Sequence, residues 1–93
     1  GPCFGVHVSS FRKGANATME AIRFEDAGFP TVIRSLVIPN KGSYVRVYLG
    51  PYADRATAEE VARQFKATGL QEYTQVHSLP GGELSAGPGR ENR

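Results

Sequence analysis

Residues 44–52 read Tyr-Val-Arg-Val-Tyr-Leu-Gly-Pro-Tyr, and the fold can be worked out from this stretch. Apolar residues alternate along it with polar or amphipathic ones: Val45, Val47 and Leu49 alternate with Tyr44, Arg46 and Tyr48. A period of two predicts a β-strand with one buried face, and Gly50-Pro51-Tyr52 predicts the turn that follows it. Residues 4–9 alternate in the same way, so a second strand of this kind is predicted near the N-terminus.

The chain resembles itself at an offset of 41 residues. This offset aligns six pairs of identical residues: Val6 with Val47, Ala15 with Ala56, Ala17 with Ala58, Ala21 with Ala62, Phe24 with Phe65 and Gly28 with Gly69. The aligned alanines and phenylalanines have the spacing of one helical face. We therefore interpret the chain as two copies of a strand-helix unit, with Asp54 as the N-cap of the second helix and a glycine at each helix end.

A further strand is predicted after each helix, at Thr31 to Ile38 and at Tyr73 to Leu79. Pro39-Asn40-Lys41-Gly42 predicts a turn, so the second and third strands should form a hairpin. The predicted order βαββαβ is the ferredoxin-like, RNP-like split βαβ fold of the α+β class. Its four-stranded antiparallel sheet has the first and third strands at the centre and carries both helices on one face.

The length of 93 residues allows one small domain, which we expect at residues 4–79. Gly1-Pro2 resembles the scar of a removed tag, so residues 1–3 are interpreted as scar and linker. Residues 80–93 contain four Gly and two Pro and are predicted to be a disordered tail. We find neither a signal peptide nor an apolar run long enough to cross a membrane.

The chemistry-bearing residues are few. Cys3 is the only cysteine, and its spacing from His7 and His77 is not that of a zinc site, so neither a disulfide nor a metal is expected. His7 lies roughly 13 Å from Cys3 along an extended strand at ~3.3 Å per residue, which is too far for nucleophilic catalysis. The sequence therefore favours a protein that is not an enzyme. Its net charge of +2 permits an anionic partner without requiring one.

The predicted fold leaves one face of the sheet open to solvent. Six residues are expected there: Gly5, His7 and Ser9 beside Tyr44, Arg46 and Tyr48. Rigid rings with polar tips on an exposed surface favour recognition of planar or sugar partners. Cross-strand pairing that only stabilises the sheet is the alternative role for these side chains.

The chain resembles a SPOR domain over about residues 4–79. The resemblance rests on the aromatic-x-Arg-Val-x-x-Gly-Pro-aromatic pattern at 44–52, on a first strand ending in Ser10-Phe11, and on the helix end Ala27-Gly28-Phe29-Pro30. SPOR sequences commonly have Gln where this chain has His7, and Gly where it has Ser9.

The resemblance implies a non-catalytic, cofactor-free module that binds peptidoglycan in the bacterial cell envelope and targets its parent protein to the division septum. The ligand would be denuded glycan strands, GlcNAc-MurNAc polymers from which amidases have removed the stem peptides. The implied glycan contacts are His7, Ser10, Tyr44, Arg46 and Val76, to which the open face adds Tyr48. The domain itself would be periplasmic or extracytoplasmic without touching the membrane, although its parent protein would often carry a membrane anchor.

The residues alone leave two other functions open. An RNA-recognition domain has the same strand and helix order, but its strand-three signature matches Lys41 to Tyr48 at only three of seven specified positions. A protein-docking module is the second alternative, because an open sheet face can accept a partner helix.

Overall fold

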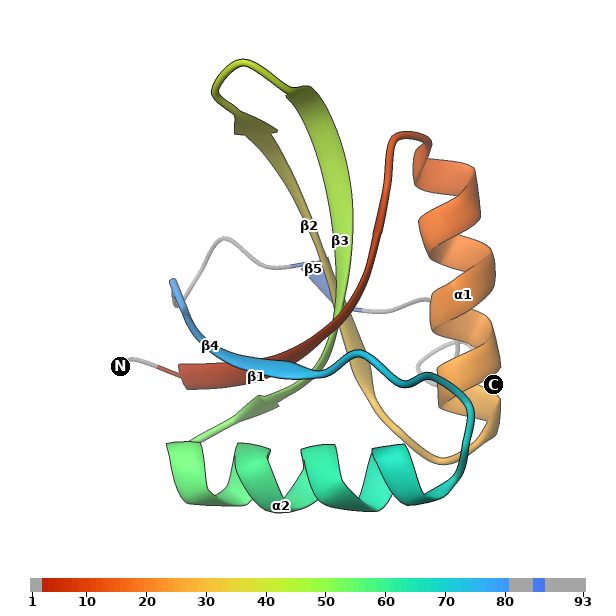
Figure 1. The fold of residues 1–93 in the computed structure, drawn as a ribbon, viewed down its shortest axis with the longest axis vertical. Helices are drawn as coiled ribbons and strands as arrows, with labels where there is room; N and C mark the ends of the chain where they lie inside the picture. The colour runs from red at the N-terminus through yellow and green to blue at the C-terminus, as the bar shows by residue number, and fades with distance from the viewer. Residues whose placement is uncertain (1–2, 81–84, 87–93) are drawn as a thin grey trace.

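The computed structural model describes residues 3–80 and the backbone of residues 85–86. The strands are β1 (Cys3–Phe11), β2 (Thr31–Ile38), β3 (Gly42–Tyr52), β4 (Gln75–Leu79) and β5 (Ser85–Ala86), and the helices are α1 (Gly14–Asp26) and α2 (Arg55–Ala67). The order of the first six elements is the predicted βαββαβ (Figure 1). None of the described helices is long and apolar enough to cross a bilayer.

The sheet has the strand order β4-β1-β3-β2-β5, and every pair in it is antiparallel. β1 and β3 lie at its centre, as predicted. The short β5 was not predicted. It pairs with Val32 and Ile33 of β2 and lies within the segment that was expected to be disordered. The rest of that segment, beyond Pro80, lies outside the described residues.

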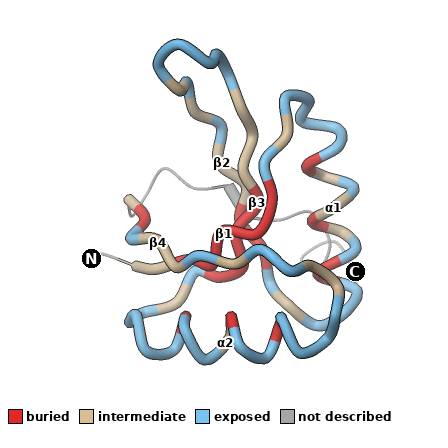
Figure 2. The backbone as a smooth tube through the Cα atoms, in the orientation of Figure 1, coloured by how far each residue is buried: buried red, intermediate tan, exposed pale blue. Residues whose placement is uncertain are grey.

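Both helices pack on the same face of the sheet, and the core lies between the helices and the sheet (Figures 1 and 2). The predicted helical faces, Ala17, Ala21 and Phe24 of α1 and Ala58, Ala62 and Phe65 of α2, are all buried. Phe65 packs edge-to-face against Phe24 and Phe29, with ring centroids 4.9 and 5.1 Å away. This cluster joins the two helices to one core.

The predicted helix ends are confirmed. The Asp54 carboxylate accepts a hydrogen bond from the Thr57 amide at 2.7 Å, and this bond lowers the pKa of Asp54. Gly28 and Gly69 follow the two helices with φ of 100° and 76°, in the left-handed region that favours glycine.

β1 contains a bulge that sequence periodicity did not predict. His7 lies opposite Tyr48 and Ser9 opposite Val47, so Val8 and Ser9 together face one residue of β3. As a result Ser9 points toward the helices, where its hydroxyl donates to Glu20 of α1 at 3.2 Å. The prediction that Ser9 lies on the open face is therefore wrong, and Ser10, opposite Arg46, takes that position instead.

Candidate functional site

The sheet face opposite the helices, here called the open face, has a buried end and an exposed end. The buried end is a small second core of Val32, Tyr48 and Leu79 with Cys3 packed against it. The exposed end carries Ser10, Arg34, Leu36, Tyr44, Arg46 and Gln75, which the strand register places on the same face.

Tyr48 connects the two ends. Its ring is 0% exposed and lies against Gly5, where a side chain would collide with Leu79 and Tyr48. Its hydroxyl accepts a hydrogen bond from Nη1 of Arg46 at 3.3 Å and lies 3.4 Å from Nδ1 of His77. The buried tyrosine thereby fixes the guanidinium of Arg46, whose buried Nε has no partner among the described residues.

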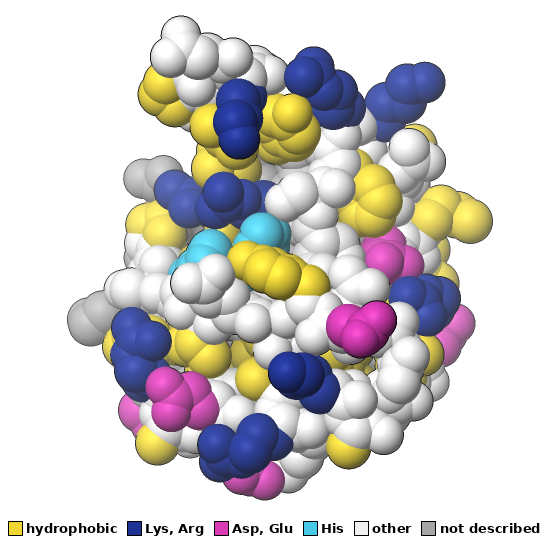
Figure 3. All heavy atoms as spheres, viewed as in Figure 1, with side chains coloured by type: hydrophobic (Ala, Val, Ile, Leu, Met, Phe, Trp, Pro, Cys, Tyr) yellow, Lys and Arg dark blue, Asp and Glu magenta, His cyan; other side chains and the backbone are white. Residues whose placement is uncertain are grey.

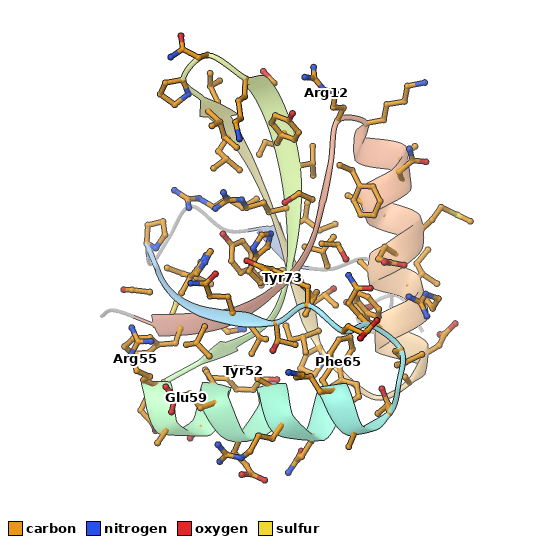
Figure 4. All side chains as sticks on the ribbon, in the orientation of Figure 1. Arg12, Tyr52, Arg55, Glu59, Phe65 and Tyr73 are labelled. Carbon is orange, nitrogen blue, oxygen red and sulfur yellow. The ribbon has the colours of Figure 1, made fainter. Side chains whose placement is uncertain are left out.

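Tyr44 and Ser10 flank Arg46 at the exposed end. The guanidinium of Arg12 lies 5.0 Å from the centroid of the Tyr44 ring, and Arg12 also donates to the carbonyl of Lys41 at 3.1 Å. Figure 4 shows Arg12 at the start of α1, level with the β2–β3 hairpin. Arg12 thus covers one face of the Tyr44 ring and holds the ring in place.

His7 and His77 lie side by side between the two ends, with ring centroids 5.2 Å apart. Burial, together with the positive charge of Arg46, lowers the pKa of His7 to about 4. Burial and Arg46 also lower the pKa of His77. Both rings are neutral at neutral pH, and Nε2 of His7 forms a hydrogen bond of 2.9 Å with the Ser10 hydroxyl.

The charge of this face is positive. Figure 3 shows Lys and Arg side chains immediately beside the two histidines, whereas the acidic side chains visible in that view lie toward the helices. Within residues 3–80, no group of three or more His, Cys, Asp or Glu is arranged to hold a metal ion. The geometry therefore suits a ligand with ring faces, hydroxyls and negative charge.

Comparison with protein families gives one match, the SPOR domain model, over residues 4–74. The chain belongs to the SPOR domain family. This is a family of generally non-catalytic domains that bind peptidoglycan in cell-envelope and division proteins. No curated protein and no solved structure matches the chain significantly.

Four of the residues predicted for the SPOR glycan site, His7, Ser10, Tyr44 and Arg46, lie together on the open face. Two do not serve as predicted. Tyr48 is fully buried, so its ring supports Arg46 and cannot be reached by a glycan. Val76 pairs with Val6 and packs on the core beneath the helices, because the alternation of β4 sends Gln75 and His77 to the open face instead.

Sequence reasoning did not place Tyr73 and Arg34 on the open face beside the predicted site of the SPOR domain. Tyr73, labelled in Figure 4, is 48% exposed. Its ring stands edge-on against His7 with centroids 5.3 Å apart, and its hydroxyl donates to Gln75 at 2.9 Å. Arg34 faces Arg46 across β2 and β3. The sequence could have placed Tyr73 on the open face, because residues 73, 75 and 77 are spaced by two and side chains two apart in a strand share a face.

A substitution at Gly5 tests the packing of the Tyr48 ring at the buried end of the open face. A Cβ at Gly5 would lie 2.5 Å from Cδ1 of Leu79 and 3.2 Å from Cβ of Tyr48. We expect Gly5→Ala to lower the free energy of unfolding by about 1–3 kcal/mol through overpacking, measured by urea denaturation. Gly14→Ala is the matched control, because a Cβ there meets nothing within 4 Å. Equal effects of the two substitutions would contradict the packing of Tyr48 on Gly5.

The buried His7 makes the stability of the SPOR domain sensitive to acid. Its pKa of about 4 lies below the 6.5 of the unfolded chain, so the unfolded state binds the proton more tightly. The resulting stability is present above pH 6.5 and lost as the pH falls toward 4. We expect a loss of roughly 2 kcal/mol, measured by denaturation at pH 7 and pH 4. His7→Gln should reduce this loss, and an unchanged loss in the variant would refute the assignment to His7.

Proposed function

We propose that this domain binds denuded glycan strands through the exposed end of its open face and brings its parent protein to the bacterial division septum. Membership of a peptidoglycan-binding family supports the ligand class. The observation that carries the finer proposal is the juxtaposition of Tyr44, Arg46 and Ser10, three different binding chemistries on neighbouring positions of β1 and β3.

Each of these side chains matches one part of a glycan. The C–H face of a sugar ring would pack on the partly exposed Tyr44 ring, on the side that Arg12 does not cover. The Ser10 hydroxyl, already held by His7, is within reach of sugar hydroxyls and N-acetyl groups. Tyr73 and Gln75 extend the same polar and aromatic surface toward β4.

Removal of the stem peptide changes the charge of the ligand. The lactyl group of N-acetylmuramic acid is an amide while the peptide is attached and a free carboxylate afterwards. Arg46 offers a planar guanidinium fork that pairs with a carboxylate. Binding of denuded strands is therefore favoured over peptide-bearing strands, whose peptide removes the charge and adds bulk over the face.

Sedimentation with purified sacculi tests this proposal. The purified domain should pellet with amidase-treated sacculi and remain largely in the supernatant with untreated sacculi. Equal retention by both, or by neither, would refute it.

Salt dependence separates nucleic-acid binding from the proposed function, and the sedimentation experiment separates a protein-docking module from it. A contact with neutral sugars and isolated carboxylates should weaken only modestly between 50 and 200 mM salt, about tenfold or less, because few charges are involved. A nucleic-acid binder that contacts many phosphates would lose affinity by orders of magnitude. A protein-docking module would bind neither preparation of sacculi.

A further inference from the structure

Arg34 lies directly opposite Arg46 in the β2–β3 pair, at the centre of the exposed end. Residues directly opposite each other in an antiparallel pair point to the same face. The neighbouring pair, Ile33 and Val47, points to the helices and packs on the core. Both arginines therefore extend over the open face, and both side chains are partly exposed.

Like charges in directly opposed positions destabilise a sheet unless something compensates them. Within residues 3–80 the ion pairs are Arg23–Glu20 and Arg63–Glu60, both on the helices, and neither involves this arginine pair. The positive charges of Arg46 and Arg34 act on the neighbouring His77, because both lower its pKa. The buried Nε of Arg46 also has no hydrogen-bond partner in this part of the chain.

An anionic group bound between the two guanidiniums would relieve this repulsion. A carboxylate suits the position, because its two oxygens accept from planar forks on both sides. A single arginine can already pair with a carboxylate through its planar fork, and a second guanidinium on the opposed residue adds donors and charge that further fix the orientation of the carboxylate.

We propose that Arg34 is a specificity-determining residue, which together with Arg46 binds the free lactyl carboxylate of a denuded glycan. This inference rests on the proposed function, because it assigns a second residue to the same ligand. It makes the arginine pair the element that distinguishes a carboxylate from the amide of a peptide-bearing strand.

Calorimetry with two ligands and two variants tests the role of Arg34. The ligands are denuded glycan oligosaccharides and the same oligosaccharides with their lactyl carboxylates converted to methylamides. For the wild-type domain we expect amidation to weaken binding about tenfold or more. Arg34→Gln should weaken binding of the carboxylate ligand about tenfold and should reduce the effect of amidation. Arg34 is partly exposed and faces a like charge, so the variant should remain folded, which a thermal melt checks.

Lys66→Gln is the control for net charge, because it removes one positive charge from the exposed surface of α2. Its affinity should stay within twofold of the wild type. Unchanged affinity and an unchanged amidation effect in Arg34→Gln would overturn the role of Arg34, and so would equal losses in Arg34→Gln and Lys66→Gln. Both results leave the proposed function intact if the wild-type domain still prefers denuded to peptide-bearing strands. Loss of that preference in the wild type overturns both.

Discussion

Replacing Arg46 with alanine is expected to weaken binding of denuded glycan by about 30-fold or more, because a bound carboxylate would cover the half-buried guanidinium, and truncating one partner of such a hydrogen-bonded charge pair costs about 2–5 kcal/mol. Arg46 lies on the exposed end beside Tyr44, and its Nη1 is held by the hydroxyl of buried Tyr48. The substitution removes the fixed guanidinium, and the Tyr48 hydroxyl keeps its contact with Nδ1 of His77 at 3.4 Å. Isothermal calorimetry measures the affinity.

Two further variants distinguish the contribution of the Arg46 charge from that of its planar fork and control for net charge. Arg46→Lys keeps the charge without the planar fork, so its affinity should fall between those of the wild type and Arg46→Ala. Lys66→Ala on α2 should bind like the wild type. If Arg46→Ala binds within threefold of the wild type while remaining folded, Arg46 is not a glycan contact.

Replacing Phe65 with alanine is expected to cause the largest loss of stability, about 3–5 kcal/mol, through a cavity in the core. The side chain is fully buried between Phe24 and Phe29 and projects from α2 toward the sheet (Figure 4). The melting midpoint should fall by at least ~12 °C in a domain of this size, as measured by calorimetry or circular dichroism.

Met19→Ala on α1 is the control for Phe65→Ala. Met19 is 70% exposed, so its truncation should change the free energy of unfolding by no more than about 0.5 kcal/mol. A loss below about 1 kcal/mol in Phe65→Ala would contradict the assignment of this cluster as the centre of the core.

The fold was predictable because each signal in the sequence was local and repeated. The period-two stretches of residues 4–9 and 44–52 and the helical faces of residues 17–24 and 58–65 each report their own burial, and the turn at residues 39–42 connects neighbouring strands. The right-handed crossover rule then leaves one arrangement for four strands and two helices. β5 escaped prediction because a two-residue strand has no periodicity.

The candidate site was predictable only in part, because it depends on long-range pairing. The bulge at Val8 and Ser9 arises from the register against Val47, which no single strand reveals. Tyr48 was expected to be exposed because its position alternates with core residues, yet Val32 and Leu79 from two other strands bury it. Val76 was implied by the family resemblance, but its pairing with Val6 turns it toward the core, and in a strand the neighbouring residue faces the opposite side.

Titration of the labelled domain with denuded glycan oligosaccharides, followed residue by residue by NMR, tests most directly where the ligand binds. The largest chemical-shift changes should fall on Ser10, Arg34, Tyr44, Arg46 and Gln75, with little change on the outer surfaces of α1 and α2. Changes concentrated on the helices, with Tyr44 and Arg46 unaffected, would contradict binding at the exposed end of the open face.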